Sequence, residues 1–128
     1  MAVHADGTLL AIEIKPAGEL GGTAWAPLQV THYTNLFRRW IETDPEAAEV
    51  VRAMLGQRVR LGLSPDLGSR LKEPLRVRPM IVIGKPVADN ALDRMRQVQG
   101  RLLEHGVGYP ELVVYGVNLA GRPTLIEV

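Results

Sequence analysis

Alternating apolar and polar residues at the start of the chain predict a β-hairpin over residues 3–15. The segment Ala5-Asp6-Gly7-Thr8 has the composition of a tight turn, and residues 9–15, Leu-Leu-Ala-Ile-Glu-Ile-Lys, form a strand that Pro16 ends. A two-residue Asp6-Gly7 turn pairs Ala5 with Thr8. We therefore expect the fold to begin with two antiparallel strands.

Apolar residues at three- and four-residue spacings then predict two helices. The first spans residues 24–42, with Pro27 in its first turn, after a flexible loop that contains Gly18, Gly21 and Gly22. Its apolar side is expected to carry the large residues Trp25, Leu28, Tyr33, Leu36, Phe37, Trp40 and Ile41. The second opens at Asp44-Pro45-Glu46, a capping residue followed by proline, and ends between Gly56 and Leu61.

The second half of the chain alternates between strand and helix. After a loop over residues 62–79, the apolar run 79–83 has the character of a strand buried on both faces. A third helix follows from Asp89 or Asn90 to His105-Gly106, and the last two strands cover residues 112–117 and 124–128. The order ββ-α-α-β-α-β-β predicts an α/β fold with a mixed central sheet flanked by helices.

Length and composition narrow the class of protein. The chain has 128 residues, 46% of them hydrophobic and 23% charged, which suits one globular domain over residues 1–128. It contains no cysteine, so disulfides, thiolate nucleophiles and cysteine-ligated metals are excluded. Neither a signal-peptide pattern nor an apolar run of about 20 residues is present. We therefore expect a cytoplasmic protein that does not interact with membranes.

Charge is unevenly distributed along the chain, although the net charge is only +1. Residues 1–51 carry a net −4, whereas residues 52–78 carry a net +5. The basic residues of this second segment are Arg52, Arg58, Arg60, Arg70, Lys72, Arg76 and Arg78. They favour a nucleic-acid partner if they share one surface, and are ordinary solvated charges if they do not.

Two charged residues occupy an otherwise apolar strand. Glu13 and Lys15 alternate along it, so they share one face while Ile12 and Ile14 share the other. Carboxylate oxygen is a preferred ligand of Mg²⁺, and a neighbouring ammonium can steady the attacking water or the phosphate charge in phosphodiester hydrolysis. The alternative is an ion pair on a solvated strand face.

The helix that follows adds Gln29 and Tyr33, one turn apart. Their spacing from Leu36 and Trp40 places Gln29 on the expected core side of the helix, where a glutamine needs hydrogen-bond partners. The alternative is a satisfied amide at the edge of the core.

Glu13-Ile14-Lys15 on a strand, a glycine-rich loop, and Gln29-Val30-Thr31-His32-Tyr33 on a helix together resemble the PD-(D/E)XK nuclease superfamily, more narrowly its RecB-like branch. The resemblance implies a restriction-endonuclease-like core that cuts DNA with Mg²⁺ or Mn²⁺. It assigns the metal to Glu13 and the carbonyl of Ile14, catalysis to Lys15, and the lining of the site to Gln29 and Tyr33.

One motif residue of that family, an aspartate on the preceding strand, has no counterpart. Asp6 is the only acid before Glu13, and at the hairpin tip it would lie about 17 Å away along the strand. The resemblance thus implies either that the sequence starts downstream of the true start or that the domain is shortened. We expect weak metal binding and a homo-oligomer that covers the exposed hairpin.

These observations leave three functions open. The first is a metal-dependent DNA nuclease, and the second is an inactive domain of the same fold that binds nucleic acid or supports assembly. The third is an unrelated structural α/β domain with a surface Glu13–Lys15 pair.

Overall fold

The computed structural model describes residues 2–63 and 71–128 and contains the predicted order of elements, ββ-αα-β-α-ββ. The strands are β1 (Ala2–Val3), β2 (Leu9–Lys15), β3 (Val77–Gly84), β4 (Val113–Val117) and β5 (Pro123–Ile126). The helices are α1 (Leu20–Thr43), α2 (Ala47–Arg60) and α3 (Asp89–Glu104). The α/β prediction is confirmed, and no helix in the described ranges is long and apolar enough to cross a membrane.

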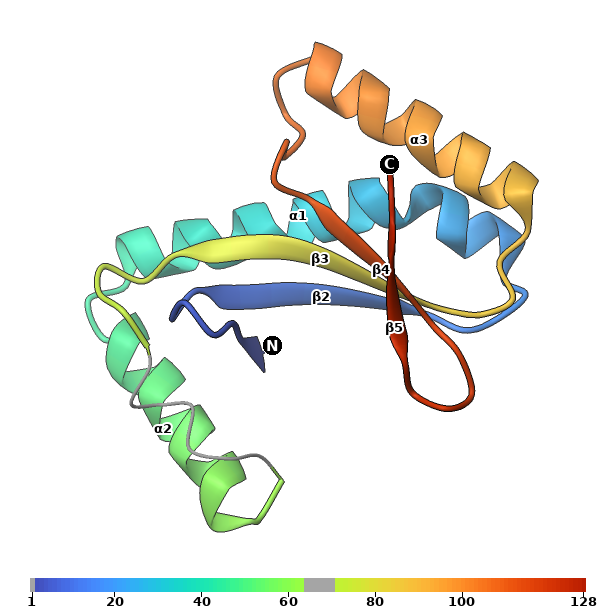
Figure 1. Cartoon of the computed structure of the whole chain (residues 1–128). Coiled ribbons are helices and arrows are strands. Elements are labelled where there is room, and N and C mark those ends of the chain that lie inside the picture. Colours follow the sequence, from blue (N-terminus) through green and yellow to red (C-terminus); the bar gives the residue numbers. More distant parts are fainter. Residues whose placement is uncertain (1, 64–70) are drawn as a thin grey trace.

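The sheet is mixed, in the order β1-β2-β3-β4-β5 (Figure 1). Its three central strands are parallel, because β2 reaches β3 through α1 and α2, and β3 reaches β4 through α3. The edge strands β1 and β5 are antiparallel to their neighbours. Pro79, inside β3, lies before the first residue paired with β4, at a position where β3 pairs with β2 alone.

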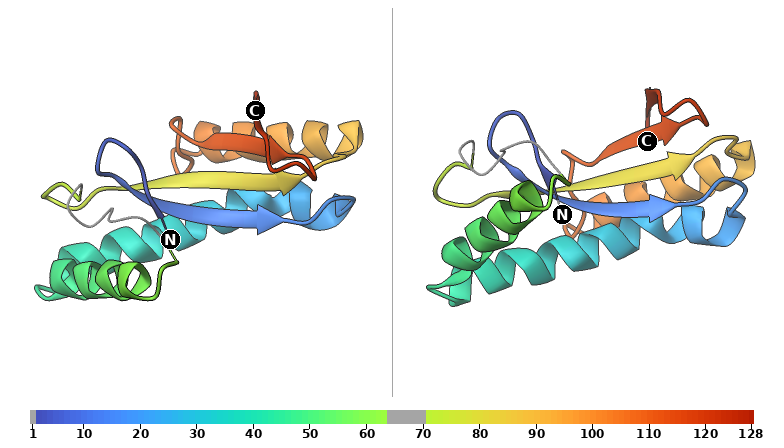
Figure 2. Two further views of the ribbon diagram at one scale, coloured as in Figure 1. Left: turned by 60° about the horizontal axis from the view of Figure 1, so that its bottom comes forward. Right: turned by 90° about the horizontal axis from the view of Figure 1, so that it is seen from below.

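The helices lie on one side of the sheet (Figure 2). Ile81 and Ile83 of β3 are buried in a cluster that includes Val30 of α1. On the other face, Ile14 is 70% exposed and Leu125 is 64% exposed. The prediction that β3 is buried on both faces is therefore wrong, since its burial alternates from residue to residue as in a strand covered on one side.

Helix α1 differs from its prediction in both length and orientation. It begins at Leu20, so Gly21 and Gly22 belong to its first turn and Pro27 lies in its interior. Its buried residues are mostly small: Thr23, Ala24, Ala26, Pro27, Val30, Thr31 and Thr34. The large residues expected in the core are largely on the outside, with Trp25, Leu28, Tyr33 and Leu36 exposed. Small side chains allow α1 to approach both the sheet and α3 closely.

The hairpin before β2 has a three-residue loop rather than the two-residue turn expected. His4 N–H donates to the Thr8 carbonyl (2.8 Å), Gly7 N–H donates to the His4 carbonyl (2.9 Å), and Gly7 has φ of 87°. This is the turn-plus-bulge arrangement in which glycine takes the left-handed position. Val3 consequently pairs with Leu9, one position away from the predicted register.

The other boundaries lie close to those predicted. Helix α2 starts at Ala47, because Asp44 first closes a turn: its Oδ1 accepts from Glu46 N–H (2.9 Å) and its carbonyl from Ala47 N–H (3.1 Å). Helix α3 ends as predicted before Gly106, whose φ is 68°. A second core cluster joins Val51 and Leu55 of α2 to Leu9 of β2.

Candidate functional site

The alternation of β2 places Glu13 and Lys15 on the face of the sheet that the helices cover. Lys15 Nζ lies 2.7 Å from Glu13 Oε1, and the two side chains are only 9% and 16% exposed, respectively. Their partners on β3 are Ile81 and Ile83, both fully buried. The surface alternative is therefore wrong: this is an ion pair held against the core beneath α1.

Such a pair is energetically demanding. Removing two charges from water costs several kcal/mol per ion, and mutual attraction offsets this only when the geometry is good. Leu9 and Ala11 on the same face of β2 pack in an apolar cluster. Apolar residues at positions 13 and 15 would therefore pack against the core as Leu9 and Ala11 do.

Helix α1 brings Gln29 to the same level of the sheet. It runs antiparallel to β2 (Figure 1), and Phe37 packs against the core cluster that contains Leu9. Gln29 precedes Phe37 by two turns, about 12 Å along the helix, which corresponds to three or four residues further along β2. This register puts Gln29 at about the level of Glu13 along the sheet.

The side-chain oxygen of Gln29 is buried and accepts no hydrogen bond within the described part of the chain. A buried acceptor without a partner costs about 1–3 kcal/mol, so each such atom in a native structure calls for an explanation. The alternative that Gln29 is a fully satisfied amide is wrong for this oxygen. It is free to accept from, or coordinate, a group that enters beside Glu13.

The side chains of Tyr33 and Ile14 are exposed and do not join the buried pair. Tyr33 is 48% exposed and lies in a shallow apolar hollow with Leu36, Phe37 and Trp40. The side chain of Ile14 points to the opposite, open face of the sheet. Its side chain therefore cannot reach the buried pair, and only its backbone carbonyl, between Glu13 and Lys15 in the chain, is left as a ligand.

The carboxylate set is small. Among residues 2–63 and 71–128, no three side chains of the His, Cys, Asp or Glu type form a group that could hold a metal ion. Asp6 is engaged elsewhere, because it pairs with Arg78 (3.1 Å) and accepts from Thr8 N–H (2.9 Å). Hydrogen bonds from Thr8, followed by those from His4, hold the pKa of Asp6 well below its usual value.

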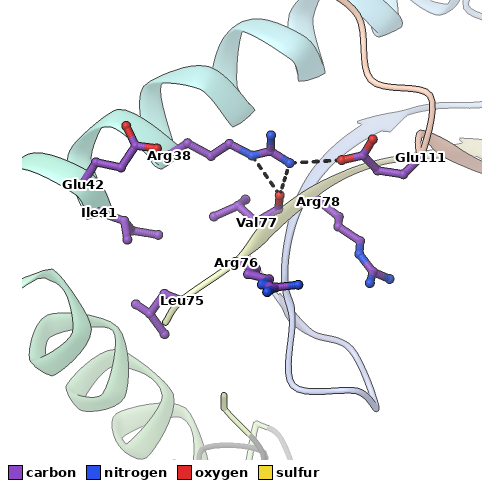
Figure 3. A pocket seen from close by; sticks show the side chains of 8 residues that line it. All are labelled: Arg38, Ile41, Glu42, Leu75, Arg76, Val77, Arg78 and Glu111. Atoms are coloured by element: carbon purple, nitrogen blue, oxygen red, sulfur yellow. Dashed lines mark hydrogen bonds and ion pairs between the residues drawn. The ribbon is translucent and has the colours of Figure 1, made fainter. Parts of the chain in front are cut away.

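A cavity of about 410 Å³ lies near the start of β3, where α1 and the segment before β4 meet it (Figure 3). Arg38 crosses it, donating to the Val77 carbonyl (2.7 Å) and to Glu111 (3.1 Å), and its guanidinium lies 4.3 Å from the centre of the Tyr109 ring. Arg38 is therefore a structural cation that ties α1 to β3.

The basic segment is divided between two places. Lys72, Arg76 and Arg78 line a neighbouring cavity of about 270 Å³ together with Asp6 and Glu73. Arg58 and Arg60 lie in the last turn of α2, and Arg52 pairs with Glu73. Arg70 lies outside the described residues. Part of the predicted basic surface is thus assembled at the start of β3, with acids interspersed.

Comparisons of the chain with protein-family models, with curated proteins and with solved structures find no match. The resemblance noted from the sequence consequently rests on the residues of β2 and α1 alone.

Proposed function

We propose that this chain is a metal-dependent nuclease-like domain with a restriction-endonuclease-like core, acting on phosphodiester bonds in DNA. The observation that carries the proposal is the Glu13–Lys15 pair on the inner face of β2, at the level of the unpartnered Gln29 oxygen. A carboxylate, an ammonium and a neutral oxygen acceptor are groups that metal-assisted phosphodiester hydrolysis can use.

The residues present fit a weakly held divalent ion. Mg²⁺ in proteins keeps several waters and is held by one or two carboxylates together with substrate phosphate. Glu13 and the carbonyl of Ile14 would hold Mg²⁺ or Mn²⁺, and the free oxygen of Gln29 supports an oxygen ligand set. A bound ion would supply an activated water and neutralise charge on the phosphate.

The remaining groups act through charge and position. Lys15, released from part of its contact with Glu13, would place its ammonium beside the phosphate charge that develops during hydrolysis. Tyr33, whose side chain is exposed, would contact the substrate outside the buried pair. The basic residues at the start of β3 would hold more distant phosphates of the same strand.

A second candidate function has an observation of its own. Within the described residues, Glu13 belongs to no group of three metal-binding side chains, and its Oε1 is already paired with Lys15. That favours a catalytically inactive domain of the same fold, serving as a nucleic-acid-binding or assembly module.

The substitution Gln29→Glu separates the two functions by adding a second carboxylate. A unit charge about 4 Å from a divalent ion gains about 2 kcal/mol even at the dielectric constant of water, so Mn²⁺ affinity should rise about tenfold or more. Calorimetric titration measures this, with the exposed Gln57→Glu on α2 as the matched control. Nicking of supercoiled plasmid DNA in Mn²⁺ is measured in parallel.

Each outcome is informative. Metal-dependent nicking by the Gln29→Glu variant, abolished by adding Lys15→Met, supports the nuclease. Tighter Mn²⁺ binding without any nicking favours the inactive module. Unchanged affinity in both Gln29→Glu and Glu13→Gln would show that no metal binds between these residues.

A further inference from the structure

A separate cavity of about 460 Å³ lies between the first half of α1 and the second half of α3. It shares no residue with the Glu13–Lys15 region. Four residues from α1, five from α3 and His105 just after α3 line it: Gly21, Ala24, Trp25, Leu28, Arg94, Gln97, Val98, Arg101, Leu102 and His105. Its volume falls within the range of about 300–1,000 Å³ that is typical of small-molecule sites.

The floor and one side of this cavity are apolar. Trp25 and Leu28 are 57% and 45% exposed, although both belong to the residue types usually buried. Val98 and Leu102 face them from α3. The exposure of these side chains within a concave surface, rather than singly on a convex one, is typical of a binding site.

The charges around the cavity are all of one sign. Arg94 and Arg101 line it from α3, His105 lines it from just after the helix, and no carboxylate among the described residues does. Neither arginine forms an ion pair with any described residue, whereas the neighbouring Arg96 pairs with Asp93. Arg101 follows Arg94 by seven residues and His105 follows Arg101 by four, so the three side chains lie on one side of the helix, along the length of the cavity.

We propose that this cavity binds a small anionic amphiphile, specifically a medium-chain carboxylate. The basic lining favours a negatively charged ligand. An apolar tail against Trp25 and Leu28 would place its carboxylate within reach of Arg94 or Arg101. The volume favours a small molecule over a folded partner, since a helix about 10 Å across would be enclosed only in part. The inference is independent of the proposed nuclease function.

Decanoate is the probe for this site. Calorimetric titration should show saturable binding at one site, and amide NMR shifts should be confined to the cavity walls on α1 and α3. Hexanoate should bind at least about tenfold more weakly, because each buried methylene contributes up to about fourfold in affinity. Decyltrimethylammonium, with the same chain and the opposite charge, should also bind at least about tenfold more weakly.

Variants test the charged rim. Arg94→Gln and Arg101→Gln should each weaken decanoate binding by about two- to fivefold, as expected for an exposed charge contact. The exposed Arg122→Gln, at the turn before β5, should leave it unchanged. Equal binding of decanoate and decyltrimethylammonium would overturn the proposal. So would shifts outside the cavity, or binding only to anionic phospholipid vesicles.

Discussion

Replacing Glu13 by Gln should destabilise the fold, because it leaves the Lys15 ammonium buried without a counter-charge. At 2.7 Å the pair has a gross attraction of about 6 kcal/mol at an effective dielectric constant of about 20. Breaking a fully buried pair costs about 3–5 kcal/mol. Since both side chains retain slight contact with water, we expect a loss of about 2–4 kcal/mol, or roughly 10 °C in Tm.

The double variant Glu13→Gln/Lys15→Met is the control for this reasoning. It removes both charges, so its free energy of unfolding should recover to within about 1 kcal/mol of the unsubstituted chain or exceed it. Urea denaturation followed by circular dichroism measures all three variants, and similar m values would show that the unfolded states are comparable. A single-variant loss below about 1 kcal/mol would mean that solvent screens the pair, which would refute the argument.

Three further results are expected. Asp6→Asn should reduce the loss of folding stability at acid pH. The lowered pKa means that ionised Asp6 stabilises the fold above about pH 4, and that this stability is lost as pH falls towards the folded-state pKa. Denaturation of both chains from about pH 5 to about pH 2 measures the difference. Gly84→Ala should destabilise by about 1–3 kcal/mol, because a Cβ would lie 2.7 Å from the Ala17 nitrogen, while Gly100→Ala, with open space around it, should not. The chain should self-associate, because in the described part of the chain β1 pairs with only two residues of β2, and Ile14 is exposed on the open face. A clean 14.1 kDa species by light scattering would contradict this.

The order of elements could be predicted because each has its own periodicity. The apolar run of β3 and the apolar stripe of α3 have few competing interpretations, and both lie within a few residues of the prediction. The alternation in β2 likewise placed Glu13 and Lys15 on one face. Their burial could not be predicted, because a two-residue period does not say which face a helix will cover.

The orientation of α1 was beyond sequence reasoning for a related cause. Large apolar residues at helical spacing lie on one side of this helix, and small ones such as Thr23, Ala26 and Thr34 lie on another. Sequence patterns favour the larger residues as core, yet close packing against both the sheet and α3 selects the smaller ones. The same preference leaves Trp25 and Leu28 in the cavity beside α3.

The two unfavourable features of the inner face lie at one level, and this coincidence is the strongest argument for chemistry there. A buried ion pair is often no better for stability than apolar residues of similar volume, and an unpartnered buried oxygen is worse than none. If the double variant at positions 13 and 15 proves more stable than the unsubstituted chain, folding cannot account for the pair. Gln29, whose oxygen gains nothing from the fold as it stands, would then share that explanation, because a cation or water held beside Glu13 satisfies both groups at once.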